Sequence, residues 1–363
     1  RRQSSAEWVA RAERLDREVH SSGSRLMLVR WLAASWRLDE AEAALDTIIL
    51  EEDKLMGANT VARAYLSTGL LHQAIILFEQ TLADSERILG PDHPDTLTSR
   101  GNLARAYLYA GGLEQAINLF KQTLADGERI LGPDHPDTLT SRGNLARAYL
   151  YAGGLEQAIN LFKQTLADGE RILGPDHPDT LTSRNNLASA YQNSGRLEQA
   201  IPLFEQNLAD RERILGPDHP DTLTSRNNLA STYRFAGRLE QAINLFEQNL
   251  TDSERILGPN HPDTLTSRNN LARAYQDADR LEQAIDLFEQ NLTDSERILG
   301  PNHPDTLTSR NNLARAYQDA DRLEQAIDLF EQNLTDSEHV LGPNHPWTTL
   351  FRDNLARARE ARN

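Results

Sequence analysis

Among the side chains able to bind a metal or transfer a proton, histidine recurs at a fixed spacing in a distinctive loop sequence. It stands in a Gly-Pro-Asp/Asn-His-Pro string that occurs seven times, at His93, His135, His177, His219, His261, His303 and His345. A zinc site needs three donors within about 2 Å of one ion, whereas equivalent residues of stacked helical repeats lie roughly 18–20 Å apart. The spacing therefore favours a structural role, in which each imidazole ties its loop to a neighbouring helix end. We expect no metal site.

Other residues that could support catalysis form no recognisable pattern. The chain has no cysteine, which removes thiolate nucleophiles and Cys-based metal sites from consideration. No Gly-x-x-x-x-Gly-Lys-Ser/Thr phosphate loop occurs. Carboxylate pairs arise throughout a chain with 54 acidic residues and carry no enzymatic signal. We therefore predict a protein that is not an enzyme and needs no cofactor.

Composition narrows the classes of partner. A formal net charge of −16 argues against binding to nucleic-acid phosphates. No apolar run approaches the roughly 20 residues that cross a bilayer, so no membrane partner is expected. Hydrophobic residues make up 39% of the chain, enough for a continuous core. The lack of cysteine fits a reducing cytoplasm, the expected location, and the start at Arg1-Arg2-Gln3 suggests a fragment of a longer protein.

The histidine string also sets a fixed period of 42 residues. It gives six full units over residues 90–341 and a half unit over 342–363, and units 90–131 and 132–173 are identical. Such an array grows by duplication, and a fixed period of this size indicates a solenoid. Residues 55–89 form an atypical repeat. Residues 1–54 are expected to hold N-terminal helices with a degenerate repeat and cap, and residues 342–363 a C-terminal capping helix.

Each unit predicts two antiparallel helices joined by a short break. In the first unit, helix A runs from Pro94 to Ala110 and helix B from Leu113 to Leu131, separated by Gly111-Gly112. Gly90 suits a left-handed position that closes the preceding helix, and Pro94 suits the first turn of the next. Toward the N-terminus we expect one helix over residues 4–20, a helix A over 25–36 and a helix B that opens at Leu38.

Several positions of each unit resemble the tetratricopeptide repeat family. In the first unit the matching residues are Asn102-Leu103-Ala104, Tyr107, Gly111, Ala116 and Phe120. That consensus spans about 34 residues, and we expect the eight extra residues, 131–138, to lengthen the end of helix B and the following loop. The 42-residue form looks like the kinesin light chain repeat and like repeat tails of bacterial STAND-type signalling ATPases. The resemblance covers about residues 54–363. It implies an all-α, right-handed superhelical solenoid of antiparallel helix pairs whose A helices line a concave groove.

The helix A face turned away from the core is the candidate binding surface. At about 100° per residue, Leu103, Ala104 and Tyr107 define the buried side, and the opposite side then carries one polar or aromatic set in each unit. The candidate peptide-binding residues are Asn102, Asn144, Asn186, Asn228, Asn270 and Asn312, with Arg105, Arg147, Arg234, Arg273 and Arg315, and with Tyr109, Tyr151 and Phe235.

An Asn amide offers a donor and an acceptor to an extended peptide backbone, and the resemblance implies that these Asn residues contact ligand main chain. Arg can pair with a carboxylate in two hydrogen bonds. The alternatives remain open. Asn could stitch adjacent A helices together, Arg could be a solvated face residue, and Tyr109 and Tyr151 could be packing residues.

The candidate groove differs along its length. The first two units present Leu108 with Tyr109 and Leu150 with Tyr151, whereas the fifth and sixth place Asp277 and Asp319 beside the groove arginines. We expect those aspartates to compensate Arg273 and Arg315. An extended peptide with acidic and aromatic side chains should therefore bind across residues 90–215 rather than 258–341. The predicted function is a protein- or peptide-binding scaffold. The alternative is an architectural spacer or self-association module with no groove ligand.

Overall fold

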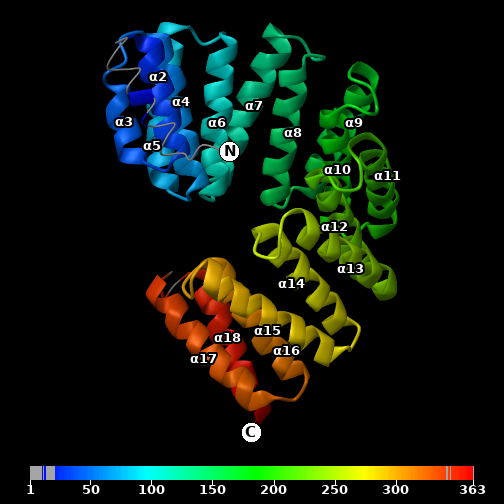
Figure 1. The fold of residues 1–363 in the computed structure, drawn as a ribbon. Helices are drawn as coiled ribbons and strands as arrows, with labels where there is room; N and C mark the ends of the chain where they lie inside the picture. Colours follow the sequence, from blue (N-terminus) through cyan, green and yellow to red (C-terminus); the bar gives the residue numbers. More distant parts are fainter. Residues whose placement is uncertain (1–9, 11, 14–20, 341, 344, 363) are drawn as a thin grey trace. The chain divides into compact units, whose positions relative to one another are not determined.

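The computed structural model describes residues 10, 12–13, 21–340, 342–343 and 345–362. This part of the chain forms seventeen α-helices and no strand (Figure 1). The A helices are α2 (Ser22–Ala34), α4 (Glu51–Ser67), α6 (Pro94–Tyr109), α8 (Pro136–Tyr151), α10 (Pro178–Asn193), α12 (Pro220–Phe235), α14 (Pro262–Asp277), α16 (Pro304–Asp319) and α18 (Pro346–Arg362). The B helices are α3 (Leu38–Leu45), α5 (Leu71–Ile88), α7 (Leu113–Ile130), α9 (Leu155–Ile172), α11 (Leu197–Leu215), α13 (Leu239–Ile256), α15 (Leu281–Ile298) and α17 (Leu323–Val340).

Contacts divide the chain into two compact parts, residues 1–183 and 184–363, with the boundary inside α10. From here on these two parts are called the first and the second unit, and each 42-residue element is called a repeat. In the first unit each helix from α4 to α9 packs on the next one, and in the second unit the same holds from α11 to α18. Short turns join each A helix to its B helix, so the two run antiparallel. The predicted all-α array of antiparallel helix pairs is confirmed.

The repeated histidine determines where each A helix starts. His93 Nδ1 accepts a hydrogen bond from the backbone N–H of Asp95 at 3.2 Å, and Pro94 occupies the first helical turn. The same bond recurs at His135, His177, His219, His261, His303 and His345. The imidazole thus satisfies one of the backbone donors that a helix start leaves unpaired. The predicted structural role is confirmed, and the helix that each His caps is the one that begins directly after it.

Glycine ends the B helices, and here one prediction holds only in part, because the eight extra residues contribute to the loop but not to helix B. Helix α7 ends at Ile130, and Gly132 follows with a φ of 95° that only glycine adopts without strain. Residues 131–138 therefore do not lengthen helix B. They form a loop and the first turn of α8, because Pro136 can begin a helix but cannot continue one. Near the N-terminus, α2 and α3 match the predicted pair, whereas the helix predicted for residues 4–20 lies mostly outside the described residues.

The core repeats with the sequence. Each full repeat contributes a B-helix phenylalanine that is at most 1% exposed, such as Phe120, packed beside the A-helix alanine Ala104. The small alanines let helices approach one another closely, while the phenylalanine rings fill the space between the helices of a repeat. This alternation places the polar positions of helix A at the surface, where the candidate site lies.

A buried arginine holds three helices together in each repeat. In α6 the guanidinium of Arg100 donates to Asp126 of α7 at 2.7 Å and to Glu86 of α5 at 3.4 Å. Its side chain is 8% exposed, and the hydrogen bond from Arg100 is the main reason that the pKa of the Asp126 carboxyl is lowered. Arginines at the same repeat position bond the aspartate of their own repeat in the same way, namely Arg142, Arg184, Arg226, Arg268 and Arg310. These arginines are structural, and sequence analysis did not single them out.

Candidate functional site

The surface stripe of α6 and α8 that bears Asn102, Arg105, Tyr109 and their equivalents 42 residues later is called here the A-helix face of the first unit. Tyr109 and Tyr151 are 53% and 61% exposed on it. These exposures weigh against the alternative that the two tyrosines are partly buried packing residues. Large aromatic side chains exposed beside arginine are typical of binding hot spots.

Leu108 does not belong to this face, contrary to the prediction. It is 7% exposed and lies in a core cluster with Phe120 and with Ala148 of α8. One residue step rotates the side chain by about 100° around the helix, which turns Leu108 from the position of Tyr109 toward the neighbouring helix. Leu150 is half-buried. The apolar part of the face is thus supplied by the tyrosines.

The asparagines of the predicted ladder bond to one another across repeats. Asn102 Nδ2 donates to Asn59 Oδ1 at 3.4 Å in the first unit. In the second unit the corresponding bonds are Asn228 to Asn185, Asn270 to Asn227, Asn312 to Asn269 and Asn354 to Asn311, at 2.8–3.0 Å. Each bond joins an A helix to the next one, at a separation of 43 residues. At these positions the structure supports the alternative in which Asn stitches adjacent A helices together.

Asn144 is the exception in the first unit. The residue 43 positions before it is Gly101 rather than asparagine, so no side chain is present to accept its hydrogen bond. Asn144 is half-buried, and its amide has no hydrogen-bond partner among the described residues. Asn186 likewise follows a glycine rather than an asparagine at a distance of 43 positions, namely Gly143. The amide of Asn144 is therefore available to a ligand in a way that the amides of the bonded asparagines are not.

In the first unit the positive charges of Arg63 and Arg147 act on Arg105, and none of the three arginines has an acidic partner among the described residues. Arg105 is half-buried, and burial lowers the pKa of its guanidinium; Tyr109 opposes this change, while the positive charges of Arg63 and Arg147 reinforce it. Within the part of the chain that the structure describes, no carboxylate lies within ion-pair distance of Arg63, Arg105 or Arg147. The face thus carries uncompensated positive charge.

The second unit has a different arrangement. Arg234 bonds to Asp277 at 2.7 Å and lies 4.7 Å from the centre of the Phe235 ring, which is 57% exposed. Asp319 accepts a hydrogen bond from Gln276 at 2.5 Å. Both contacts again join residues 43 positions apart.

The predicted compensation of Arg273 and Arg315 by these aspartates therefore holds only in part: their direct bonds go to Arg234 and Gln276, although the charge of Asp277 still opposes the burial that lowers the pKa of Arg273. The register between adjacent A helices brings each aspartate opposite the preceding repeat instead. The positive charges of Arg234 and Arg315 still lower the pKa of Arg273, after the larger effect of burial. The second unit thus holds its own cationic column, but with an internal carboxylate bonded to Arg234.

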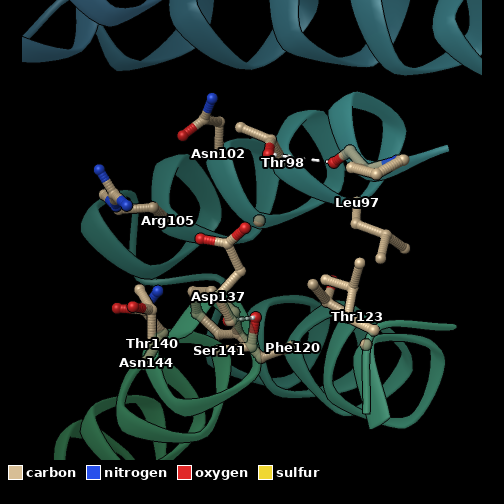
Figure 2. Close-up of a pocket in the computed structure, with 14 residues that line it drawn as sticks. Leu97, Thr98, Asn102, Arg105, Phe120, Thr123, Asp137, Thr140, Ser141 and Asn144 are labelled. Atoms are coloured by element: carbon tan, nitrogen blue, oxygen red, sulfur yellow. Dashed lines mark hydrogen bonds between the residues drawn. The ribbon is translucent and has the colours of Figure 1, made fainter. Parts of the chain in front are cut away.

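A cavity of about 170 Å³ opens on the first unit between α6 and α8, with α7 behind it (Figure 2). Figure 2 shows Arg105, Asn102, Thr140 and Asn144 on one side of it and, on the other, the apolar Leu97 with Thr123, whose hydroxyl is bonded to the carbonyl of Leu119. The cavity therefore combines hydrogen-bond donors with a hydrophobic wall, which is how small ligand groups are oriented in proteins.

The described residues contain no arrangement for metal chemistry and no membrane span. No group of three or more His, Cys, Asp or Glu side chains among them could hold a metal ion. None of the helices described is both long and apolar enough to cross a bilayer.

Comparison with protein families gives a consistent match over most of the chain. A tetratricopeptide repeat model matches residues 54–128, 167–206, 179–251, 236–293 and 269–335. A second tetratricopeptide repeat model matches residues 138–179. A search of curated proteins finds no match.

Solved structures with similar folds include three informative neighbours. A putative kinesin light chain with nearly identical TPR-like repeats from Podosopora anserina is 34% identical, with a TM-score of 0.52 over 56% of this chain and 97% of that chain. The STAND protein with a tetratricopeptide repeat sensor from Pyrococcus horikoshii is 16% identical, with a TM-score of 0.60 over 94% of this chain and 50% of that chain. A Rap protein complexed with Competence and Sporulation Factor is 13% identical, with a TM-score of 0.52 over 94% and 98%.

Proposed function

Because the chain belongs to the tetratricopeptide repeat family, we propose that it is an interaction scaffold that binds an extended peptide on the A-helix face of its first unit. Members of this family generally serve protein interactions and are typically not catalytic. The Rap neighbour is a tetratricopeptide-like fold that carries a bound factor. The observation that carries the proposal is the uncompensated arginine column beside two exposed tyrosines.

Charge supports a peptide with acidic side chains. Arg105 and Arg147 lie near one another with no carboxylate partner among the described residues. An anionic group placed between them would relieve their mutual repulsion. In the second unit Asp277 already occupies Arg234, so an acidic ligand gains less there.

Buried area supports aromatic side chains in the same peptide. Tyr109 and Tyr151 are each more than half exposed, and their rings can stack on an aromatic side chain or on a peptide plane. Such contacts contribute about 0.5–1.5 kcal/mol beyond the buried area. The free amide of Asn144 adds a donor and an acceptor for ligand main chain. Charge, apolar area and backbone recognition thus meet on α6 and α8.

The test is a selection of random 12-residue peptides on the immobilised full chain, followed by calorimetric titration of the selected synthetic peptides. We expect acidic and aromatic residues to be enriched. Tyr151→Ala should weaken binding by about 2 kcal/mol, as a hot-spot residue does. Asn144→Ala should cost about 0.5–1.5 kcal/mol. Asp319→Ala, in the second unit, is the matched control and should bind like the parent protein.

The alternative is an architectural spacer or self-association module. Near-identical repeats and the exposed apolar residues Trp36, Ile49 and Leu50, which are 59–72% exposed, favour it. It would replace the peptide-binding function if the selection enriched no peptide, or if Tyr151→Ala and Asn144→Ala stayed folded and bound selected peptides normally. Sedimentation equilibrium of the full chain would then measure self-association.

A further inference from the structure

One residue position separates the A helices into two kinds. In most repeats the A helix carries an Asn-Asn pair, as at Asn227-Asn228, whereas the first two repeats carry Gly101-Asn102 and Gly143-Asn144. The first Asn of a pair accepts the bond from the next A helix, as Asn227 does from Asn270 at 2.9 Å. A Cβ at Gly101 would meet no heavy atom within 4 Å, so this glycine leaves open space.

The consequence appears when two equivalent cavities are compared. The cavity of about 190 Å³ between α12 and α14 ends at Asn227, and its lining includes neither Asn228 nor Asn270. In the first unit the lining continues past Gly101 to Arg105 and Asn144 (Figure 2). The two cavities have similar volumes and differ in the side chains that they reach: in the second unit the lining stops at Asn227, which bonds to Asn270, and Ser231 stands at the position of Arg105, whereas in the first unit the lining continues past Gly101 to the cationic column.

The first-unit cavity has room for a group several times larger than one water molecule. At about 170 Å³ it exceeds several times the roughly 30 Å³ that one water occupies in the liquid. Its lining includes Leu97 and Phe120, which can hold the methylene stem of a side chain, and across from Leu97 lie Arg105 and Asn144, whose N–H groups can donate hydrogen bonds to a ligand. A single side chain with an apolar stem and an anionic end would place its stem against the apolar residues and its charge beside Arg105 and Asn144.

One acidic residue, Asp137, also lines the cavity and sets how much anionic charge it accepts. Asp137 lies in the first turn of α8, where the helix end stabilises negative charge, and its carboxylate lies 3.7 Å from His135 Nδ1. Against this one carboxylate stand Arg105 and its neighbouring arginines, without ion pairs among the described residues. The balance favours a carboxylate over a neutral amide, and a neutral amide over a cation.

We propose that this cavity takes a glutamate side chain of the bound peptide, with Arg105 and Asn144 binding its carboxylate, and that glycine at position 101 is the residue that admits it. The proposal rests on the peptide-binding function proposed above and assigns its selectivity to one position. An asparagine at 101 would bond to Asn144 and take its amide away from the cavity, as Asn227 does with Asn270 in the second unit.

The absence of cysteine allows a site-specific test on the full chain. Thr98 is exposed at the cavity rim, so Thr98→Cys can carry a trifluoromethyl label read by fluorine NMR. The probe is N-acetyl-glutamate N-methylamide, and its glutamine counterpart is the neutral isostere. Thr224→Cys places the same label at the equivalent rim of the second-unit cavity, whose lining stops at Asn227.

We expect the glutamate probe to shift the Thr98→Cys label saturably and the glutamine probe to bind at least tenfold more weakly. Gly101→Asn should reduce the response at least tenfold, and Asp137→Asn should strengthen binding by removing a like charge. The Thr224→Cys label should stay silent until Asn227→Gly and Ser231→Arg together copy the first-unit arrangement. Circular dichroism establishes that each variant is folded.

Two results would overturn the proposal: equal binding of both probes, or an unchanged response in folded Gly101→Asn. The peptides selected on the parent chain separate this failure from failure of the peptide-binding function. If they bind Gly101→Asn normally but lose affinity in Tyr151→Ala, the cavity assignment is wrong and the scaffold function stands. If no peptide is selected, the scaffold function itself is wrong.

Discussion

Exchanging glycine and asparagine between Gly101 and Asn227 should move stability in opposite directions. Asn227→Gly removes the 2.9 Å bond from Asn270. One such bond contributes about 0.5–1.5 kcal/mol net, and glycine in a helix interior costs roughly 0.3 kcal/mol more than asparagine. Because Asn227 and Asn270 are only half-buried, the freed amide finds water and adds no large desolvation cost. We expect a loss of about 1 kcal/mol.

Gly101→Asn should give a similar gain, because its Cβ meets nothing and Asn144 lies ready to bond. A double-mutant cycle isolates the bond. The gain from Gly101→Asn should fall by about 1 kcal/mol when Asn144→Ala is also present. The assay is urea unfolding followed by circular dichroism, with variants compared only where the m-value is unchanged. A coupling energy near zero, or an Asn227→Gly variant as stable as the parent, would refute the reasoning about these bonds.

Three further outcomes are expected from urea unfolding of other variants. Because the pKa of Asp126 is lowered in the folded state, its bond to Arg100 contributes its full stability above the unfolded pKa of about 3.9. That stability is lost as the pH falls through the lower folded pKa. Asp126→Asn should therefore lower the free energy of unfolding at pH 7 and make that free energy fall less steeply in acid. Asn333 is fully buried with both amide atoms unbonded, so Asn333→Thr should stabilise by about 1 kcal/mol, whereas Asn291→Thr, which removes a bonded amide, should not. Gly153 has a φ of 78°, so Gly153→Ala should cost about 1–2 kcal/mol, and an unchanged midpoint would contradict that strain.

The period, the helix bounds and the caps were predictable because they depend on local rules. Gly90 at a helix end, Pro94 in a first turn and His93 in the loop between them each act within a few residues of their own position. A 42-residue repeat then carries each local solution along the chain. Because the repeats arose by duplication, the helix bounds predicted for one repeat apply to all six.

The contacts between repeats were not predictable in the same way. The register that brings Asp277 to Arg234 and Asn270 to Asn227 joins residues 43 positions apart, which a helical wheel of one repeat does not contain. The buried arginine at Arg100 was missed for a related reason. From the sequence alone, an arginine on a helix with many acidic neighbours is expected to be solvated. Its burial becomes evident only when the structure shows its two carboxylate partners, one in each flanking B helix.

Photo-crosslinking tests most directly whether a peptide binds on the A-helix face of the first unit. A selected peptide carrying one photoreactive phenylalanine analogue would be irradiated with the full chain and digested with trypsin. The account predicts crosslinks in the fragment Gly-Asn-Leu-Ala-Arg, and in the tyrosine-bearing fragment that follows it, which occur only in residues 90–173. Crosslinks confined to fragments of residues 258–341, where Asn-Asn-Leu-Ala-Arg replaces the first of these, would contradict it.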